Sequence, residues 1–593
     1  MSQPADFTAD RRLITLSALA VPIGALCAFV AVGLLDLIAL FTNLFYFHRF
    51  SLHGVGPAAN TLGGWAVAAP VAGGLIVGLM ARFGSDRIRG HGIPEALESI
   101  LIGRARMEPK IAVLKPLSSA VAIGSGGPFG AEGPIIMTGG ACGSIIGQFF
   151  HLTTAERKTL LVAGAAGGMS ATFGTPVAAV LLAVELLLFE WKPRSFIPVA
   201  RASATAAALR PMLLGGGALF PVSGIVHFGP LALAGCLVVG LAAGLMSSFL
   251  TWAVYGAEDL FHRLPFHWMW WPALGGLAVG IGGLIEPRAL GVGYDVIADV
   301  LRGGPATGPL VRLLLVKGLI WSLALGSGTS GGVLAPLLMM GASVGLILSP
   351  ILPAGGHALW PLIGLSAILA GTMRSPLTGI IFALELTRRV DALLPLLIAC
   401  SAAFALTVLI LPRSILTEKV ARRGHHLSRE YTVDPLETLM VGQVATKPAV
   451  TVPATLPIRE LESLFFDMRT GNAHQGYPVV DEKGRLVGVV TRSDLLGLPS
   501  AEDLGNIPVA SAIGRMAVIA HPDETCRAAA DRMAAEGVGR LPVVRREAPQ
   551  EVIGILTRSD IFKARERDLD VEQRRESIIK LPGGEKWPPF GRG

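Results

Sequence analysis

One carboxylate lies in a glycine-rich stretch that a regular membrane-spanning helix could not contain. The stretch Gly124–Pro134 reads Gly-Ser-Gly-Gly-Pro-Phe-Gly-Ala-Glu-Gly-Pro and is embedded in apolar sequence. Irregular backbone at membrane depth is tolerated only where it is buried in protein or lines a wet cavity. Because Pro134 opens a helix-competent apolar run, we expect free backbone N–H groups there, at the positive end of a helix dipole. Glu132 could fill this anion site when ionised and leave it when protonated, which predicts an anion pathway with a glutamate gate.

The second half of the membrane sequence repeats the first at nearly one offset. The matching features are Gly124-Ser-Gly126 and Gly326-Ser-Gly328 (offset 202), Gly90-x-Gly92 and Gly291-x-Gly293 (offset 201), and Pro176 with Glu185 and Pro376 with Glu385 (offset 200). We infer two homologous halves, 13–212 and 229–411. Transporter repeats of this kind place their site at the repeat interface, where broken helices converge. The repeat alone does not decide whether the halves are inverted.

The composition is that of a multi-pass membrane protein with a soluble part appended. Of 593 residues, 52% are hydrophobic and 16% are charged, with mean hydropathy +0.58, whereas soluble proteins carry about 25% charged residues. The net charge of +7 comes from dispersed Lys and Arg residues, so we expect a lipid bilayer and no nucleic acid as partner. Five scattered cysteines indicate neither a disulfide framework nor a metal site. Without a nucleophile–base pair or a phosphate-binding loop, we predict no enzyme activity and no catalytic residue.

The sequence after about Arg413 is richer in charge and contains period-2 strands. Two units there end a strand in Thr-Arg-Ser-Asp and lead into a helix, at Thr491–Asp494 and Thr557–Asp560. The predicted strands include Gly476–Val480, Leu486–Thr491 and Leu541–Arg545. The predicted organisation is an N-terminal cytosolic segment 1–12, membrane repeats 13–212 and 229–411 with a linker 213–228, a terminal membrane helix and linker 412–436, soluble repeats 437–499 and 506–566, and a tail 567–593.

Three glycine motifs in duplicated halves carry a family resemblance. Gly90-x-Gly-Ile-Pro94, Gly130-x-Glu-Gly-Pro134 and Gly332-x-x-x-Pro336 resemble the CLC chloride channels and chloride/proton antiporters, and the two Thr-Arg-Ser-Asp units resemble tandem CBS domains. The resemblance covers about 13–566. It implies a polytopic α-helical membrane protein with two inverted repeats of broken helices, followed by a cytosolic α/β pair of CBS domains. It also implies a homodimer with one anion pathway per subunit.

The resemblance assigns roles to residues of this sequence one by one. Glu132 falls on the gating glutamate, and Lys115 matches a basic residue behind the filter with an electrostatic role, although a lysine there could also snorkel to an interface. Backbone donors of the three motifs would bind the anion and replace its hydration shell. The predicted anion-binding residues are Gly90, His91, Gly92, Ile93, Pro94, Gly130, Ala131, Gly133, Pro134, Gly332, Val333, Leu334, Ala335 and Pro336.

Several positions depart from the family pattern around the central anion. His91 stands where the family usually has serine, Ala131 replaces a basic residue, and Leu334 replaces phenylalanine. Leu416 stands where a helix after the second half usually brings a tyrosine hydroxyl. Either central binding is weaker, or His91 supplies the missing donor, and a histidine titrating near ~6.5 would make the pathway pH-dependent.

The inner glutamate of the family's antiporters is also replaced. Its aligned position holds Leu186, and Glu185 is the neighbour. Glu185 is therefore a candidate for the proton path. The alternative is a structural role shared with its repeat partner Glu385, such as pairing with arginine or capping a backbone group.

The soluble repeats offer a second candidate site. Thr491, Asp494, Thr557 and Asp560 could be helix N-caps only, or they could contact the ribose and phosphates of an adenine nucleotide such as ATP or AMP, as the matching residues of CBS domains often do. No other cofactor and no metal is expected.

Taken together, the sequence predicts voltage- and pH-sensitive anion transport, with chloride/proton antiport through a glutamate gate as the main hypothesis. A passive chloride channel on the same fold, regulated by the CBS domains, is the alternative, and Leu186 favours it. A third hypothesis is a nucleotide sensor with a membrane anchor, but an anchor needs no repeated helix-end glycine loops. We expect a multi-pass protein of the bacterial inner membrane with both termini in the cytoplasm.

Overall fold

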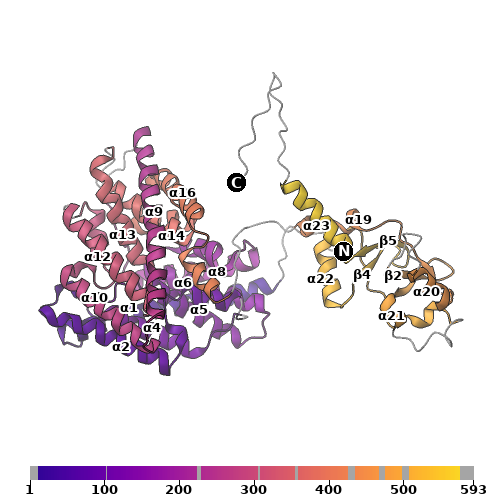
Figure 1. Ribbon diagram of the computed structural model, residues 1–593, viewed down its shortest axis with the longest axis horizontal. Coiled ribbons are helices and arrows are strands. Elements are labelled where there is room, and N and C mark those ends of the chain that lie inside the picture. Colours follow the sequence, from indigo (N-terminus) through magenta and orange to yellow (C-terminus); the bar gives the residue numbers. More distant parts are fainter. Residues whose placement is uncertain are drawn as a thin grey trace, which may run out of the picture. The chain divides into compact units, whose positions relative to one another are not determined.

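The computed structural model describes residues 11–573 except 102, 104, 223–228, 305–306, 354–357, 425–434, 467–474 and 497–506. Most of the predicted cytosolic segment 1–12, parts of the predicted linkers 213–228 and 412–436, and most of the tail 567–593 lie outside the described residues. The chain forms two compact units, Asp6–Glu430 and a second one that contains Tyr431–Gly593. Figure 1 shows the helices up to α16 gathered in the first unit and all labelled strands in the second.

In its described residues, the first unit contains two sets of eight α-helices in the same order, followed by one more α-helix. The first set is α1 Arg12–Phe47, α2 Ala68–Phe83, α3 Ile93–Leu101, α4 Pro109–Gly124, α5 Glu132–Gln148, α6 Thr154–Phe173, α7 Pro176–Leu182 and α8 Pro193–Leu213. The second set is α9 Pro230–His262, α10 Trp271–Ile285, α11 Tyr294–Leu301, α12 Thr307–Gly326, α13 Leu334–Leu348, α14 Leu359–Met373, α15 Pro376–Thr387 and α16 Leu393–Ile410, and α17 Ile415–Arg422 ends the unit.

Both sets contain membrane spans as well as shorter apolar helices. Among the described residues, seven helical segments are long and apolar enough to cross a membrane. Three apolar helical segments are shorter, namely Pro176–Leu188, Leu359–Met373 and Pro376–Thr387. The first of them consists of α7 continued by one stretch of π-helix, Ala183–Leu188. These short segments are the broken helices that the glycine- and proline-rich sequence predicts.

Local sequence signals set several helix boundaries. Helix α6 begins with a capping box of Thr153 and Glu156 and ends at Gly174 in a left-handed conformation, φ 67°. A proline then starts the next helix in both repeats, at Pro176 and Pro376. A proline at the first helical position has no N–H that would need a partner there, which is why the same signal recurs.

Glycines allow equivalent helices to touch backbone to backbone in both repeats. Helix α5 packs on α6, and α13 packs on α14. A Cβ atom added to Gly164 would lie 2.0 Å from the Gly139 carbonyl oxygen, and one added to Gly364 would lie 2.1 Å from that of Gly341. Small residues at such contacts are a common basis of helix packing in membranes.

The second unit holds two small sheets. The first contains β1 Val452–Pro453, β2 Gly476–Val480 and β3 Leu486–Thr491, and the second contains β4 Arg540–Val544 and β5 Val552–Thr557. Strands β1 and β2 are parallel, whereas β2–β3 and β4–β5 are antiparallel. The helices are α18 Pro435–Thr438, α19 Val441–Val444, α20 Ile458–Phe466, α21 Arg492–Leu496, α22 Cys526–Ala535 and α23 Arg558–Gln573.

The cores of the two soluble repeats exchange their leading segments. Val441, which precedes the first sheet, is buried in the core around β4 and β5. Val509, which precedes the second sheet, is buried in the core around β2 and β3. Each apolar core therefore includes a segment that precedes the sheet of the other repeat in sequence.

Candidate functional site

Two glycine motifs are joined by a reciprocal pair of backbone hydrogen bonds. The Gly130 N–H donates to the Gly332 carbonyl at 3.1 Å, and the Gly332 N–H donates to the Gly130 carbonyl at 2.8 Å. The third motif is tied in as well, because the Gly331 N–H donates to the Gly90 carbonyl at 3.4 Å. The N-termini of α3, α5 and α13 therefore meet at one place, where their dipoles favour a negative charge.

Helix α5 begins at Glu132, two residues before the proline at which we expected it. Its first turn is closed by the Ile135 N–H, which donates to the Ala131 carbonyl at 3.0 Å. Pro134 still lies within the first turn, where a missing N–H costs nothing. The carboxylate is thus the first residue of its own helix rather than a residue of the preceding loop.

The Glu132 carboxyl group lies at the N-terminus of the opposite repeat's helix. Its side chain is 0% exposed, and Oε1 accepts from the Ala335 N–H at 3.1 Å. Oε2 has no hydrogen-bond partner among the described residues. Room for the group exists because Gly130 and Gly332 lack side chains; a Cβ atom on either would lie 1.7 Å or 2.7 Å from Oε2. The carboxyl group occupies a helix-end position that would suit an anion.

The other predicted anion-binding residues of the three motifs are all buried beside this point. One predicted donor is already used, because the Gly92 N–H donates to Glu95 Oε2 at 3.0 Å. Glu95 is itself 4% exposed and forms ion pairs with Lys419 at 2.7 Å and Arg423 at 3.4 Å. Sequence reasoning missed Glu95, although a glutamate three residues after the motif glycine is the spacing of a capping box.

His91 opens onto a cavity on the side of α17. Its ring is 3% exposed, and Nδ1 is buried without a hydrogen-bond partner in the described part of the chain. The cavity has a volume of about 400 Å³, and its lining includes Arg89, Tyr255 and Lys419. An N–H at Nδ1 could therefore be offered to an anion in this cavity.

Two buried lysines hold equivalent turns in the two repeats. Lys115 is 0% exposed, and its ammonium donates to the carbonyls of Ile88 and Gly90, both at 2.8 Å. Lys317 is also 0% exposed and donates to the carbonyls of Ala289 and Gly291, both at 2.9 Å. Sequence reasoning singled out Lys115 alone.

The sequence repeat contains a signal that predicts a role for Lys317. From 115 to 317 the offset is 202 residues, which is the offset of the central motif. In the structure each ammonium fixes the turn before α3 or α11. Each ammonium group donates to two carbonyl oxygens close to the point where the helix ends meet.

Glu185 and Glu385 cap each other's helices across the two repeats. Glu185 accepts from the N–H groups of Leu377 and Thr378 at 3.2 and 2.8 Å, at the start of α15. Glu385 accepts from the N–H groups of Val177 and Ala178 at 3.0 and 2.8 Å, at the start of α7. This reciprocal contact is a shared capping role of the kind that the sequence repeat suggested. The same contact occupies both oxygens of the candidate proton acceptor Glu185.

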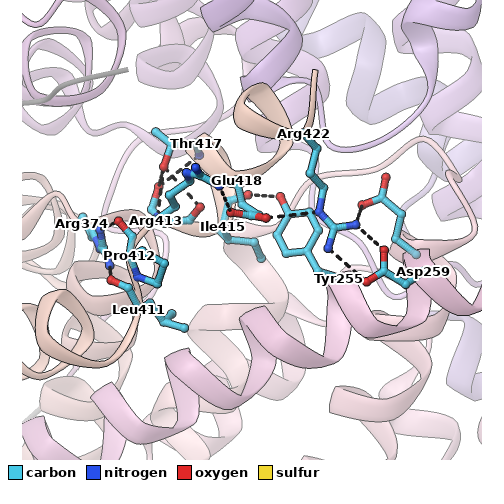
Figure 2. Close-up of polar contacts among 12 residues, drawn as sticks. Tyr255, Asp259, Arg374, Leu411, Pro412, Arg413, Ile415, Thr417, Glu418 and Arg422 are labelled. Carbon is cyan, nitrogen blue, oxygen red and sulfur yellow. Dashed lines mark hydrogen bonds and ion pairs between the residues drawn. The ribbon is translucent and has the colours of Figure 1, made fainter. Parts of the chain in front are cut away.

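Helix α17 is fixed to α9 by polar contacts that Figure 2 shows. The Tyr255 hydroxyl donates to the Ile415 carbonyl at 2.5 Å, and Arg422 binds Asp259 at 2.5 Å. The Arg422 guanidinium also lies 4.7 Å from the centre of the Tyr255 ring. This anchoring places Leu416, which is 0% exposed, in the apolar core, so α17 brings no hydroxyl to the helix ends.

The candidate residues of the soluble repeats form matching local caps. The Thr491 N–H and hydroxyl both donate to Asp494 Oδ2 at 2.7 Å. The Thr557 N–H and hydroxyl donate to Asp560 Oδ2 at 2.8 and 2.7 Å. Both pairs therefore stabilise the first turn of the helix that follows, as N-caps do.

Each of these caps also lines a cavity. Thr491 and Asp494 line one of about 800 Å³, and Thr557 and Asp560 line one of about 470 Å³. Arg540 and Arg558 line both cavities. Burial, together with the nearby Arg558 charge, lowers the pKa of the Arg540 guanidinium. Asp494 acts on Arg540 in the opposite direction, so the cavities combine arginine and aspartate side chains.

Comparison with protein families matches both units. Residues 73–408 match the family described as voltage gated chloride channel. Residues 441–500 and 510–567 match the CBS domain.

Relatives and solved structures agree with these matches. The chain is 29% identical over 366 residues to a putative chloride channel protein, ClcB-like, of Ralstonia nicotianae, with 59% of this chain and 84% of that protein covered. It is 31% identical over 336 residues to the H(+)/Cl(-) exchange transporter ClcA of Citrobacter koseri, with 53% and 69% covered.

Solved structures of the same fold cover most of the chain. A slow cyanobacterial Cl⁻/H⁺ antiporter superposes with a TM-score of 0.61 at 21% identity and covers 70% of this chain and 98% of that one. A eukaryotic CLC transporter superposes with a TM-score of 0.56 at 18% identity and covers 93% of this chain and 98% of that one. The predicted fold class, a CLC-like helical membrane unit followed by CBS domains, is confirmed.

Proposed function

Because the chain belongs to the voltage gated chloride channel family, we propose that it exchanges chloride for protons across the membrane. Relatives that are described as H(+)/Cl(-) exchange transporters support the proposal. The observation that carries it is the Glu132 carboxyl group, fully buried and bound to the Ala335 N–H at the start of α13. A group in this place can both block an anion and carry a proton.

The proposed mechanism is a competition for one helix end. Ionised Glu132 occupies the N–H groups at the start of α13, which keeps an anion out. Protonation removes the charge that the helix end attracts, so a chloride ion displaces the neutral carboxyl group. Return of the carboxylate expels the chloride, and the proton leaves on the side to which the carboxyl group has access. Glu132, the backbone donors of the three motifs and His91 are the proposed pathway residues.

Purified protein in liposomes with a chloride gradient tests the proposal directly. We expect the gradient to drive protons against their own gradient, recorded as a change in external pH. Glu132→Gln should abolish proton movement while chloride flux continues. Glu286→Gln is the matched control, since Glu286 is 5% exposed but paired with Arg312 at 2.9 Å, and it should leave coupling intact. Proton movement in Glu132→Gln equal to wild type would overturn the proposal.

A specific observation favours a passive channel as the second candidate. Leu186 is 0% exposed and cannot bind a proton, and both oxygens of Glu185 accept hydrogen bonds from the start of α15. The inner half of a proton path would then need water or another group. If chloride moves in the wild type without any proton movement, the protein is a channel. Leu186→Glu is then the first substitution that should be tested for a gain of proton movement.

For the soluble unit we propose binding of an adenine nucleotide at the two cavities. Support comes from the matching CBS domains and from Arg540 and Arg558, which supply positive charge to both cavities. Calorimetry on the full-length protein with ATP or AMP tests this. We expect Asp494→Asn and Asp560→Asn each to weaken binding at its own cavity. Heat of binding below detection with both nucleotides in the wild type would leave the aspartates as N-caps only.

We further propose a homodimer in the bacterial inner membrane with both termini in the cytoplasm and without enzyme activity. Family membership and relatives from bacteria support these statements. Light scattering of the detergent-solubilised protein tests the dimer. Fusions of a periplasmic and a cytoplasmic reporter to the C-terminus test the orientation, and activity of the periplasmic reporter would contradict it.

A further inference from the structure

Two buried oxygen atoms near the gate lack a hydrogen-bond partner in the described structure. They are Glu132 Oε2 and the Tyr294 hydroxyl oxygen. The two side chains nevertheless lie close enough to interact with each other. Buried polar groups are rarely left unpaired unless they serve a function or hold an unseen ligand.

The Tyr294 ring is held in place by its surroundings, so its hydroxyl has a defined position. It is the first residue of α11 and follows Gly293, whose left-handed conformation (φ 75°) turns the chain into the helix. Its ring packs edge-on against Phe173 at 6.3 Å and against Phe220 at 6.0 Å between ring centres. Lys317 fixes the same turn through the Gly291 carbonyl at 2.9 Å.

The Tyr294 hydroxyl has no counterpart in the first repeat. The equivalent position of the first repeat, 201 residues earlier, is Ile93, which is 0% exposed and has no donor. The two positions at which the family resemblance implies side-chain hydroxyls hold His91 and Leu416 instead. A phenolic hydroxyl is thus present beside the gate of a protein that lacks it at the expected positions.

We propose that the Tyr294 hydroxyl donates to the Glu132 carboxylate in the closed state and to the anion that replaces it in the open state. This inference rests on the proposed transport function. The hydroxyl would be a positioning and selectivity residue whose donor changes partner as the gate moves. It adds a second side-chain donor, besides His91, to the backbone N–H groups of the proposed site.

The charged neighbours determine the sign of the expected pH effect. In the described residues, the charged side chain that acts on Glu132 is Lys317, which in turn is influenced by Asp295. Neither group changes when the Tyr294 hydroxyl is removed. A hydroxyl donates more strongly to an ionised carboxylate than to a neutral carboxyl group, so it favours the ionised, closed gate. Its removal should let protons open the gate at a higher pH.

Chloride flux of Tyr294→Phe in liposomes, measured between pH 4 and 8, tests the proposal. We expect the pH of half-maximal flux to rise by about one unit, the scale of one charge-assisted hydrogen bond. In a Glu132→Gln background the same substitution should produce no pH shift but should weaken chloride binding several-fold. A merely structural effect would appear in both backgrounds alike.

Controls separate this role from folding and from the proposed function. Tyr46→Phe removes another buried hydroxyl, which donates to the Ser125 carbonyl at 2.8 Å, and should keep the wild-type pH profile. If Tyr294→Phe does not fold, 3-fluorotyrosine at position 294, a stronger donor, should lower the half-maximal pH. An unchanged pH profile with intact chloride flux overturns the Tyr294 role alone. Wild-type protein that carries no chloride overturns both inferences.

Discussion

The two membrane repeats share their supporting contacts and differ at positions near the meeting helix ends. The matched positions are Lys115 and Lys317, Glu185 and Glu385, Gly164 and Gly364, and Gly130 and Gly332. The positions that differ are Glu132 and Leu334, Ile93 and Tyr294, His91 and Val292, and Glu95 and Val296. The residues that occur in both repeats therefore hold the helix ends together. The residues that occur in one repeat only supply a carboxylate, a hydroxyl or an imidazole.

This division has a physical reason. A helix end that binds anions needs only backbone N–H groups, and both repeats provide them. A gate that carries protons needs one carboxyl group that competes for the site, and a second one opposite would repel it. We therefore expect substitutions of matched residues to act equally in the two repeats, and substitutions of unmatched residues to act on transport.

The largest effect is expected at the glycine contacts between neighbouring helices. Gly164→Val and Gly364→Val would each place atoms within about 2 Å of a backbone carbonyl, a clash that rigid helices cannot relieve. We expect both to abolish folded protein in the membrane fraction, judged by monodisperse elution. Gly33→Val is the control, because nothing lies within 4 Å of its Cβ position. Survival of only one of the two variants would break the equivalence of the repeats.

The next effect concerns the buried lysines. Lys317→Met leaves the Ala289 and Gly291 carbonyls without a donor in the described structure, whereas Lys115→Met leaves the Ile88 carbonyl without one and the Gly90 carbonyl with only the Gly331 N–H at 3.4 Å. The loss costs about 2 kcal/mol or more, offset in part because a buried charge is removed. We expect similar losses in denaturation temperature in detergent. Only Lys317→Met should also move the pH profile of chloride flux, since Lys317 fixes the turn that carries Tyr294. An equal pH shift in Lys115→Met would contradict this distinction.

A smaller effect is expected at the reciprocal glutamate caps. Glu185→Gln and Glu385→Gln keep an acceptor but lose its charge at a helix N-terminus, so each should cost about 1 kcal/mol. Thermal denaturation should show the same loss for both. The proton-to-chloride ratio separates them: it falls only in Glu185→Gln if Glu185 belongs to the proton path, and in neither variant if both are caps.

The smallest effect is expected in the soluble repeats. Asp494→Asn and Asp560→Asn weaken matching caps, each by about 0.5 to 1 kcal/mol. Differential scanning calorimetry of the full-length protein should show nearly equal shifts of the soluble unit's transition. Saturating nucleotide should raise that transition in the wild type, and a variant that no longer responds identifies the cavity that is occupied.

Much of this arrangement could be predicted from sequence because the repeat leaves several independent marks. Glycine motifs, prolines and the glutamate pair recur at nearly one offset, and these marks predicted two halves with broken helices. Helix-end chemistry predicted that Glu132 lies at a helix N-terminus, but not that its carboxyl group binds the N-terminus of α13 in the other repeat. The family, the fold class and the exchange function of relatives agree with that interpretation.

Other parts of the site depend on long-range contacts that no local sequence pattern predicts. Tyr294 lies 162 residues after Glu132 in the chain, from 132 to 294, and only packing brings the two together. The Gly92 donor is taken by Glu95, whose partners Lys419 and Arg423 come from the last helix of the unit. Such long-range pairings determine which backbone donors remain free, and sequence spacing cannot express them.

The double hydrogen bond between Gly130 and Gly332 limits how this molecule can move. Many transporters open by rocking one repeat against the other. Here such a motion would have to pull apart the two bonded segments and leave their amides unpaired at membrane depth, where each unpaired group is costly. We therefore expect the two repeats to stay joined at this point during the proposed transport, so that the Glu132 side chain is the part that moves. Transport would then require the rotation of one side chain instead of a rigid-body rotation of one repeat against the other.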